Sequence, residues 1–217
     1  MFPGPACGLA VIAVLLLAGC TSHKTPDQSI SAADSAAIIQ NVLAYRAEKE
    51  EFFRTSPYSP FLGDTSVHFS GIRWYPPSIE FYFRSKLIRY RHPETVIVLG
   101  TKGEERHQVK YGYFTFSYGE RTFRLNAYKD AAASTEARGR LLAVWFTDST
   151  TNAETYGVGR YLDVGEESDD TDYLYPLDFN NAYNPYCAYN SAYSCAIPRR
   201  EDRLEIAIRA GELKYHP

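Results

Sequence analysis

The sequence predicts a mainly β domain, an antiparallel β-sandwich or partly closed barrel with one N-terminal amphipathic helix. Beyond residue 78, several short runs rich in aromatic and β-branched residues follow one another at close spacing, a composition typical of strands. One helical pattern precedes them, and no repeat of fixed period is found. The chain has 217 residues, of which 45% are hydrophobic, and this is enough for one sizeable core.

The N-terminal segment, residues 1–19, has the features of a lipoprotein signal peptide. Leu9 to Leu17 is uniformly apolar but shorter than the roughly 20 residues that a membrane span needs. The string Leu17-Ala18-Gly19-Cys20 follows and resembles the lipobox of bacterial lipoproteins, although no Lys or Arg precedes Leu9. By this resemblance Cys20 is acylated and becomes the mature N-terminus. An ordinary secretory signal and a buried apolar helix with an incidental Cys are the alternatives.

An acylated chain would be held in the cell envelope, with its lipid in a membrane on the exported side. Residues 20–31 are then the acylated Cys and a polar tether, and residues 32–217 form a single globular domain. Thr21 rather than Asp follows Cys20, which in such lipoproteins favours the outer membrane where a cell has two. The net charge of -3 and the lack of a basic stripe argue against nucleic acid as a partner.

A helix is expected to begin after Ser31, because Ser31-Ala32-Ala33-Asp34 fits a capping box. It has to end before Ser56, since Ser56 precedes a proline and is pushed towards extended geometry. Arg46 and Glu50 are placed to pair at i, i+4. The predicted apolar side consists of Ile38, Val42, Tyr45 and Phe52, with Ile39, Leu43 and Phe53 adjoining.

Strands are predicted throughout the remaining sequence. The clearest is a hairpin from Tyr111 to Tyr128, in which aromatic and apolar residues alternate on both sides of a turn at Gly119-Glu120. The other predicted strands are Ile79–Tyr90, Thr95–Gly100, Arg140–Phe146, Thr155–Val164 and Arg203–Leu213.

Several common motifs of catalysis and cofactor binding are absent. The sequence has no GxGxxG, P-loop, HExxH or GxSxG string. Its five His residues are scattered, and the acidic segment from Glu166 to Asp172 lacks the Gly and Glu of an EF-hand loop. We therefore predict no cofactor and no metal site, and the motifs leave open whether the protein is an enzyme.

Two cysteines, Cys187 and Cys195, remain in the mature domain after Cys20. An even pair in an exported domain favours a disulfide, with free thiols or a metal site as the alternatives. The surrounding run, Leu177 to Pro198, is rich in Asn and Tyr. Asn amides can cap the backbone of an irregular segment. The functional alternative is a polar pocket lined by Asn180, Tyr183, Asn184 and Tyr189.

A second cluster consists of Tyr156, Arg160 and Tyr161. On a strand, Tyr156 and Arg160 share one face and Tyr161 lies on the other. Arg160 is expected to pair with Asp178 or Glu212. Such a buried ion pair is either a structural clamp or part of a site.

These residues carry a resemblance to a known family. The strings SPYSPF, GIRWYPP, FTDSTTNAETYGVGRYLDV, LDFNNAYNPYCAYNSAYSC and AIRAGELKY are similar to the domain of unknown function 1684 family, over roughly Ala44 to Tyr215. The resemblance implies no established reaction.

Three functions are therefore compared. The first is a non-catalytic envelope lipoprotein that binds a small polar or carbohydrate-like ligand, or another envelope component. The second is an enzyme, for example a hydrolase, that uses Asp178 or Glu212 beside Arg160. The third is a structural module with no small ligand. The first is favoured by the tether, the high Tyr content and the missing catalytic motifs.

Overall fold

The architecture is two antiparallel sheets with one long helix against them, in a computed structural model that describes residues 1, 30–61 and 68–216. The larger sheet has five strands in the order β2-β3-β4-β5-β6, and the smaller pairs β1 with β7. The sheets do not close into a barrel. The two antiparallel sheets and the single long N-terminal helix confirm the predicted mainly β, sandwich-like fold. Residues 2–29, which include most of the predicted signal peptide, Cys20 and most of the predicted tether, lie outside the described residues.

The elements have the following bounds. The helices are α1 (Ala32–Thr55) and α2 (Glu136–Arg140), and short 3-10 turns are η2 (Ile79–Phe81), η3 (Phe179–Asn181), η4 (Tyr186–Ala188) and η5 (Arg200–Asp202). The strands are β1 (Tyr82–Ser85), β2 (Ile88–Leu99), β3 (Glu105–Tyr118), β4 (Arg121–Asp130), β5 (Leu141–Phe146), β6 (Arg160–Glu166) and β7 (Tyr175–Asp178).

The β3–β4 hairpin forms as predicted and supplies much of the core. Phe116 pairs with Phe123 and Phe114 with Leu125 across the two strands, and all four side chains are buried. The Phe116 ring lies 5.2 Å from the ring of Phe179 in η3. The alternating apolar side chains of the hairpin therefore face the smaller sheet and η3. Together they form one continuous aromatic core.

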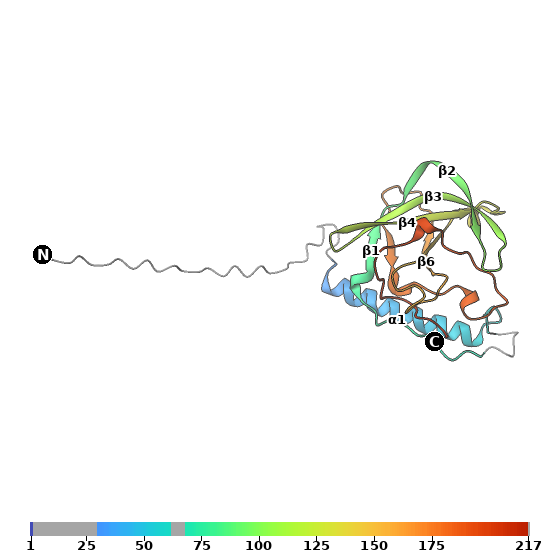
Figure 1. Cartoon of the computed structure of the whole chain (residues 1–217), viewed down its shortest axis with the longest axis horizontal. Helices are drawn as coiled ribbons and strands as arrows, with labels where there is room; N and C mark the ends of the chain where they lie inside the picture. Colours follow the sequence, from blue (N-terminus) through green and yellow to red (C-terminus); the bar gives the residue numbers. More distant parts are fainter. Residues whose placement is uncertain (2–29, 62–67, 217) are drawn as a thin grey trace.

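Helix α1 lies on the opposite side of the domain from strands β2, β3 and β4 (Figure 1). The Ser31 side chain caps it by accepting from the Asp34 amide, as predicted, and Ser56 ends it. The predicted apolar side is only partly right, because the buried positions are Val42, Arg46 and Phe53, while Leu43 and Phe52 are exposed. The helix turns a basic residue inward.

Arg46 is that inward residue, and the predicted pair with Glu50 does not form. Its Nη1 donates to the carbonyl of Tyr75 at 2.8 Å, and its Nη2 donates to the carbonyl of Asn180 at 2.9 Å. The guanidinium also lies 4.6 Å from the centre of the Trp74 ring. Two buried carbonyls and a ring face hold the guanidinium more firmly than an exposed i, i+4 partner would.

Three strand predictions need correction. Segment Arg203–Leu213 forms isolated bridges rather than a strand, because the carbonyls of its second half are bonded to the Arg160 side chain. Thr155–Gly159 is a turn, so that strand starts only at Arg160. Residues Ile79–Tyr90 divide into η2, β1 and the start of β2. Strand β7 was not predicted, since Pro176 within it argues against a central strand, and it pairs only with β1.

Gly211 provides a test of how the C-terminal segment packs. Its φ is +77°, and a Cβ there would lie 2.4 Å from the Ala182 carbonyl oxygen and 2.9 Å from that of Phe179. We expect Gly211→Ala to lower the free energy of unfolding by about 3 kcal/mol or more, from strain and clash together.

The matched control is Gly103→Ala. Gly103 has a similar φ of +86° but nothing within 4 Å of its added Cβ, so only the strain of about 1–2 kcal/mol applies. Chemical denaturation of the full chain measures both. Equal losses for the two variants would show that the close approach of Gly211 to residues 179–182 is wrong.

Candidate functional site

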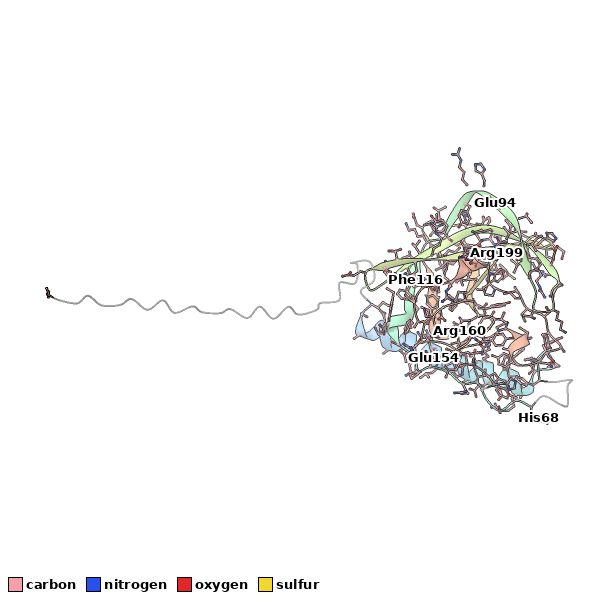
Figure 2. All side chains as sticks on the ribbon, in the orientation of Figure 1. His68, Glu94, Phe116, Glu154, Arg160 and Arg199 are labelled. Atoms are coloured by element: carbon pink, nitrogen blue, oxygen red, sulfur yellow. The ribbon has the colours of Figure 1, made fainter. Side chains whose placement is uncertain are left out.

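Arg160 lies at the start of β6, in the interior of the domain (Figure 2), and its side chain is 1% exposed. Its Nη2 lies 2.9 Å from Asp148 Oδ2 and also donates to the Ile208 carbonyl at 2.8 Å. Its Nη1 donates to the carbonyls of Ala210 and Glu212. One side chain therefore binds three carbonyls of the C-terminal segment together with one carboxylate.

Asp148, not Asp178 or Glu212, is the carboxylate that pairs with Arg160. Besides Arg160, Asp148 Oδ2 accepts from the Ile208 amide at 3.0 Å, and Oδ1 accepts from the Thr150 amide and hydroxyl at 2.9 and 2.6 Å. Both oxygens are fully engaged inside the protein. The arrangement, which we call the Arg160 clamp (Arg160, Asp148 and the carbonyls of residues 208, 210 and 212), leaves no position for a substrate.

The predicted residues Asp178, Asn180 and Asn184 hold the backbone. Asp178 caps η3 by accepting from the Asn180 amide at 3.1 Å. Asn180 exchanges two hydrogen bonds with the backbone of Ser78, at 2.8 and 2.9 Å, and Asn184 donates to the Leu213 carbonyl at 2.8 Å. Burial raises the pKa of Asp178, against the lowering effect of its hydrogen bonds with Asn180 and of Arg46. These side chains position loops, and none of them lines the pocket described below.

Glu212 is fully buried and joins three parts of the chain. One carboxylate oxygen lies 2.8 Å from Nζ of Lys49 in α1. The other accepts from the Asn184 amide at 2.9 Å and from the Tyr189 hydroxyl. Buried carboxylates need partners of this kind, so Glu212 fixes α1 and the Asn- and Tyr-rich run against the C-terminal segment.

A pocket of about 600 Å³ lies between α1, β6 and this run. We call it the aromatic pocket. Its lining is Tyr45, Glu48, Lys49, Phe52, Phe53, Tyr161, Asp163, Tyr183, Pro185, Tyr186, Tyr193, Ser194 and Cys195. Of the residues predicted for a site, only Tyr161, Tyr183 and Cys195 belong to it. Arg160 and Asp178 do not.

Hydrogen bonds and a cation–ring contact hold the polar groups of the aromatic pocket in place. The Tyr183 hydroxyl donates to Asp163 at 2.9 Å, and Lys49 Nζ lies 4.2 Å from the centre of the Tyr183 ring. The Tyr161 hydroxyl donates to the Ala196 carbonyl at 2.7 Å. Burial, with the charges of Asp163 and Glu212, raises the pKa of Tyr45. Burial raises the pKa of Tyr161, Tyr183 and Tyr186 as well. These tyrosines therefore stay neutral at physiological pH and offer ring surface and hydroxyl groups.

Sequence reasoning missed Tyr45, Glu48 and Lys49 as pocket residues. For Lys49 a signal was present, since Val42, Arg46, Lys49 and Phe53 form one stripe at spacing i, i+4, i+7, i+11. Two of these four positions are basic, so a hydrophobic pattern does not select the stripe.

The two cysteines are both free thiols, so the predicted disulfide is not formed in this structure. They are close neighbours, because the Cys187 amide donates to Cys195 Sγ at 3.3 Å. Tyr156 lies in the turn before β6, not on a strand face with Arg160, and its hydroxyl is 3.6 Å from Cys187 Sγ. The hydrogen bond from Cys195 lowers the pKa of Cys187 to about 6, against desolvation and with help from Tyr156. This contact favours the thiolate form of Cys187 over that of Cys195.

Two further properties bear on function. Within residues 30–61 and 68–216, no three His, Cys, Asp or Glu side chains are grouped so that they could hold a metal ion. In the same part of the chain, no helix is both long and apolar enough to span a bilayer.

The Arg160 clamp gives a direct test of its structural role. Arg160→Met leaves the buried Asp148 carboxylate and three carbonyls without their donor, and we expect it to cost about 3–5 kcal/mol of the free energy of unfolding. Chemical denaturation measures the loss. Arg209→Met, which removes an exposed partner of Glu154, serves as the control and should cause little change. A small effect of Arg160→Met would contradict the clamp.

Comparisons with known proteins agree with this picture of the domain. The family model described as protein of unknown function (DUF1684) matches residues 67–213. The solution NMR structure of an uncharacterised protein of Haloarcula marismortui is similar, with a TM-score of 0.63 and 28% sequence identity, over 84% of this chain and 97% of that chain. No functionally curated protein matches significantly. Since the family model covers more than half of the chain, the protein belongs to the DUF1684 family of proteins of unknown function.

Proposed function

We propose that this protein is a membrane-anchored lipoprotein of the cell envelope whose domain binds a small polar ligand in the aromatic pocket. The observation that carries the binding role is the pocket itself. Its volume of about 600 Å³ is in the range of small-molecule sites.

The lining of the pocket suits a polar molecule with some apolar surface. Five tyrosines and two phenylalanines line it, with Glu48, Lys49 and Asp163 among them. Aromatic rings supply contact area at low cost in conformational entropy, and the hydroxyl and charged groups orient a ligand. Because hydrogen bonds to Ala196 and Asp163 already fix Tyr161 and Tyr183, binding needs little reordering of these walls.

The hydrolase alternative receives no support from the geometry. It requires a reactive carboxylate beside Arg160 with space for a substrate. The carboxylate beside Arg160 is Asp148, which is 1% exposed and saturated by Ile208, Thr150 and Arg160. Asp178 and Glu212 are bonded to other parts of the backbone. A binding module fits these facts better than an enzyme built on Arg160.

The anchoring half of the proposal is based on the sequence. Cys20 follows an apolar run and small residues, and two or more acyl chains on it would hold the protein stably, at about 0.8 kcal/mol for each buried CH₂. The polar residues from Thr21 to Ile30 would act as a tether to α1. The aromatic pocket would then lie on the exported side of the membrane that carries the lipid anchor.

Anchoring is tested by replacing the acylation point. Cys20→Ser is expected to abolish incorporation of labelled palmitate and to move the protein from the membrane fraction to the soluble fraction, or to block its processing. Cys195→Ser, which leaves the lipobox intact, should label like the unmodified protein. Equal labelling of Cys20→Ser and the unmodified protein would refute the lipoprotein assignment.

Binding is tested by ligand-observed NMR with three probe classes: a neutral sugar (glucose), a dicarboxylate (succinate) and an organic ammonium ion (choline). At least one should bind saturably. Tyr193→Ala removes a half-exposed ring from the pocket and should weaken that binding about fivefold or more. Tyr173→Ala removes a similarly exposed ring elsewhere and should have no effect. If no probe binds saturably, or if Tyr193→Ala has no effect on binding, the aromatic pocket is not the site.

A further inference from the structure

The geometry points to an organic cation, an amine or quaternary ammonium compound, as the class of ligand that the aromatic pocket selects. This inference rests on the proposed binding function and adds the charge of the ligand to it. Three observations carry it: two carboxylates without a basic partner, one lysine whose charge is already matched, and a wall of aromatic rings.

The two carboxylates are Glu48 and Asp163. Both line the pocket and both are exposed. Neither is within ion-pair distance of a basic side chain among residues 30–61 and 68–216. Among the described residues, the Asp163 side chain accepts a hydrogen bond only from the neutral Tyr183 hydroxyl, at 2.9 Å. The pocket therefore presents two negative charges to an entering molecule.

Lys49 is the basic residue of the lining, and its charge is compensated. Its Nζ lies 2.8 Å from the fully buried Glu212, and its side chain is 11% exposed. Arg106, which donates to the Ser194 carbonyl at the edge of the pocket, is paired with Glu104 at 2.7 Å. An anionic ligand would have to displace one of these pairs and approach Glu48 and Asp163, both of which are unfavourable.

The aromatic wall gives a cation a further advantage over a neutral ligand. A cation within about 6 Å of a ring centre is attracted by the ring, by about 0.5–2 kcal/mol depending on desolvation. Lys49 already occupies such a position, with Nζ at 4.2 Å from the Tyr183 ring centre and 5.5 Å from that of Phe53. Phe52, Tyr161, Tyr186 and Tyr193 supply further rings in the same pocket. Carboxylates combined with rings favour an ammonium group over a sugar.

The test compares choline with its uncharged isostere 3,3-dimethyl-1-butanol, which has the same shape without the positive charge. Titrations of the full-length protein are followed by NMR at low salt. We expect saturable binding of choline and binding of the isostere that is weaker by about tenfold or more. Raising the salt concentration should weaken choline binding and leave the isostere unaffected.

Two variants locate the effect. Glu48→Gln and Asp163→Asn should each weaken choline binding by about threefold or more without changing the isostere. The Glu48 side chain makes no hydrogen bond or ion pair to another described residue, so its variant is not expected to affect folding. The control is Glu94→Gln, an exposed carboxylate on β2 that lies far from α1 (Figure 2), and it should leave choline binding unchanged.

The outcomes separate this inference from the proposed function. Equal affinity for choline and the isostere, or choline affinity that Glu48→Gln and Asp163→Asn both leave unchanged, would overturn the preference for a cation. Saturable, Tyr193-dependent binding of glucose or succinate without choline binding would do the same while leaving the binding function in place. No saturable binding of any of the four probes would overturn both.

Discussion

The C-terminal third of the domain depends on the hydrogen bonds and the ion pair of the buried Arg160 guanidinium. An arginine cannot be neutralised inside a protein, so its burial is tolerable only with a carboxylate and carbonyls around it. Asp148 supplies the carboxylate, and residues 208, 210 and 212 supply the carbonyls. The segment that carries these carbonyls forms isolated bridges rather than a ladder, because these three acceptors are taken by one side chain instead of a neighbouring strand. Asp148, bonded to the Ile208 amide, completes the same arrangement.

The position of the pocket follows from this arrangement by a short sequence of contacts. The Arg160 clamp places Glu212 in the interior, where its carboxylate has to find partners. Those partners are Lys49 of α1, the Asn184 amide and the Tyr189 hydroxyl. Helix α1 and the Asn- and Tyr-rich run are therefore fixed on either side of the same carboxylate. The aromatic pocket is the space left between them, so its walls are held in place by the ion pairs Arg160–Asp148 and Lys49–Glu212.

Local secondary structure can be predicted from this sequence. Hydrogen bonds between a side chain and a distant part of the backbone cannot. The β3–β4 hairpin was predictable because Phe114, Phe116 and Phe123 alternate with period two around a glycine turn, and the start of α1 because Ser31 satisfies free amides. The C-terminal segment was mistaken for a strand because its apolar alternation is real but its acceptors go to Arg160. Asp148 as the partner of Arg160, and Lys49 as the partner of Glu212, depend on contacts that no local pattern encodes.

In the run from Leu177 to Pro198, the Asn and Tyr side chains have different roles. Its amides go to the backbone: Asn180 to Ser78, Asn184 to Leu213 and Asn190 to the Pro60 carbonyl. Its tyrosines Tyr183, Tyr186 and Tyr193 line the pocket. An irregular segment whose backbone is held in this way keeps its exposed rings in place without a strand or helix. Rings held in advance lose little entropy when a ligand arrives. A preformed pocket wall that consists of a loop therefore needs Asn residues to hold its backbone and Tyr residues to form its surface. This accounts for the abundance of both in one stretch.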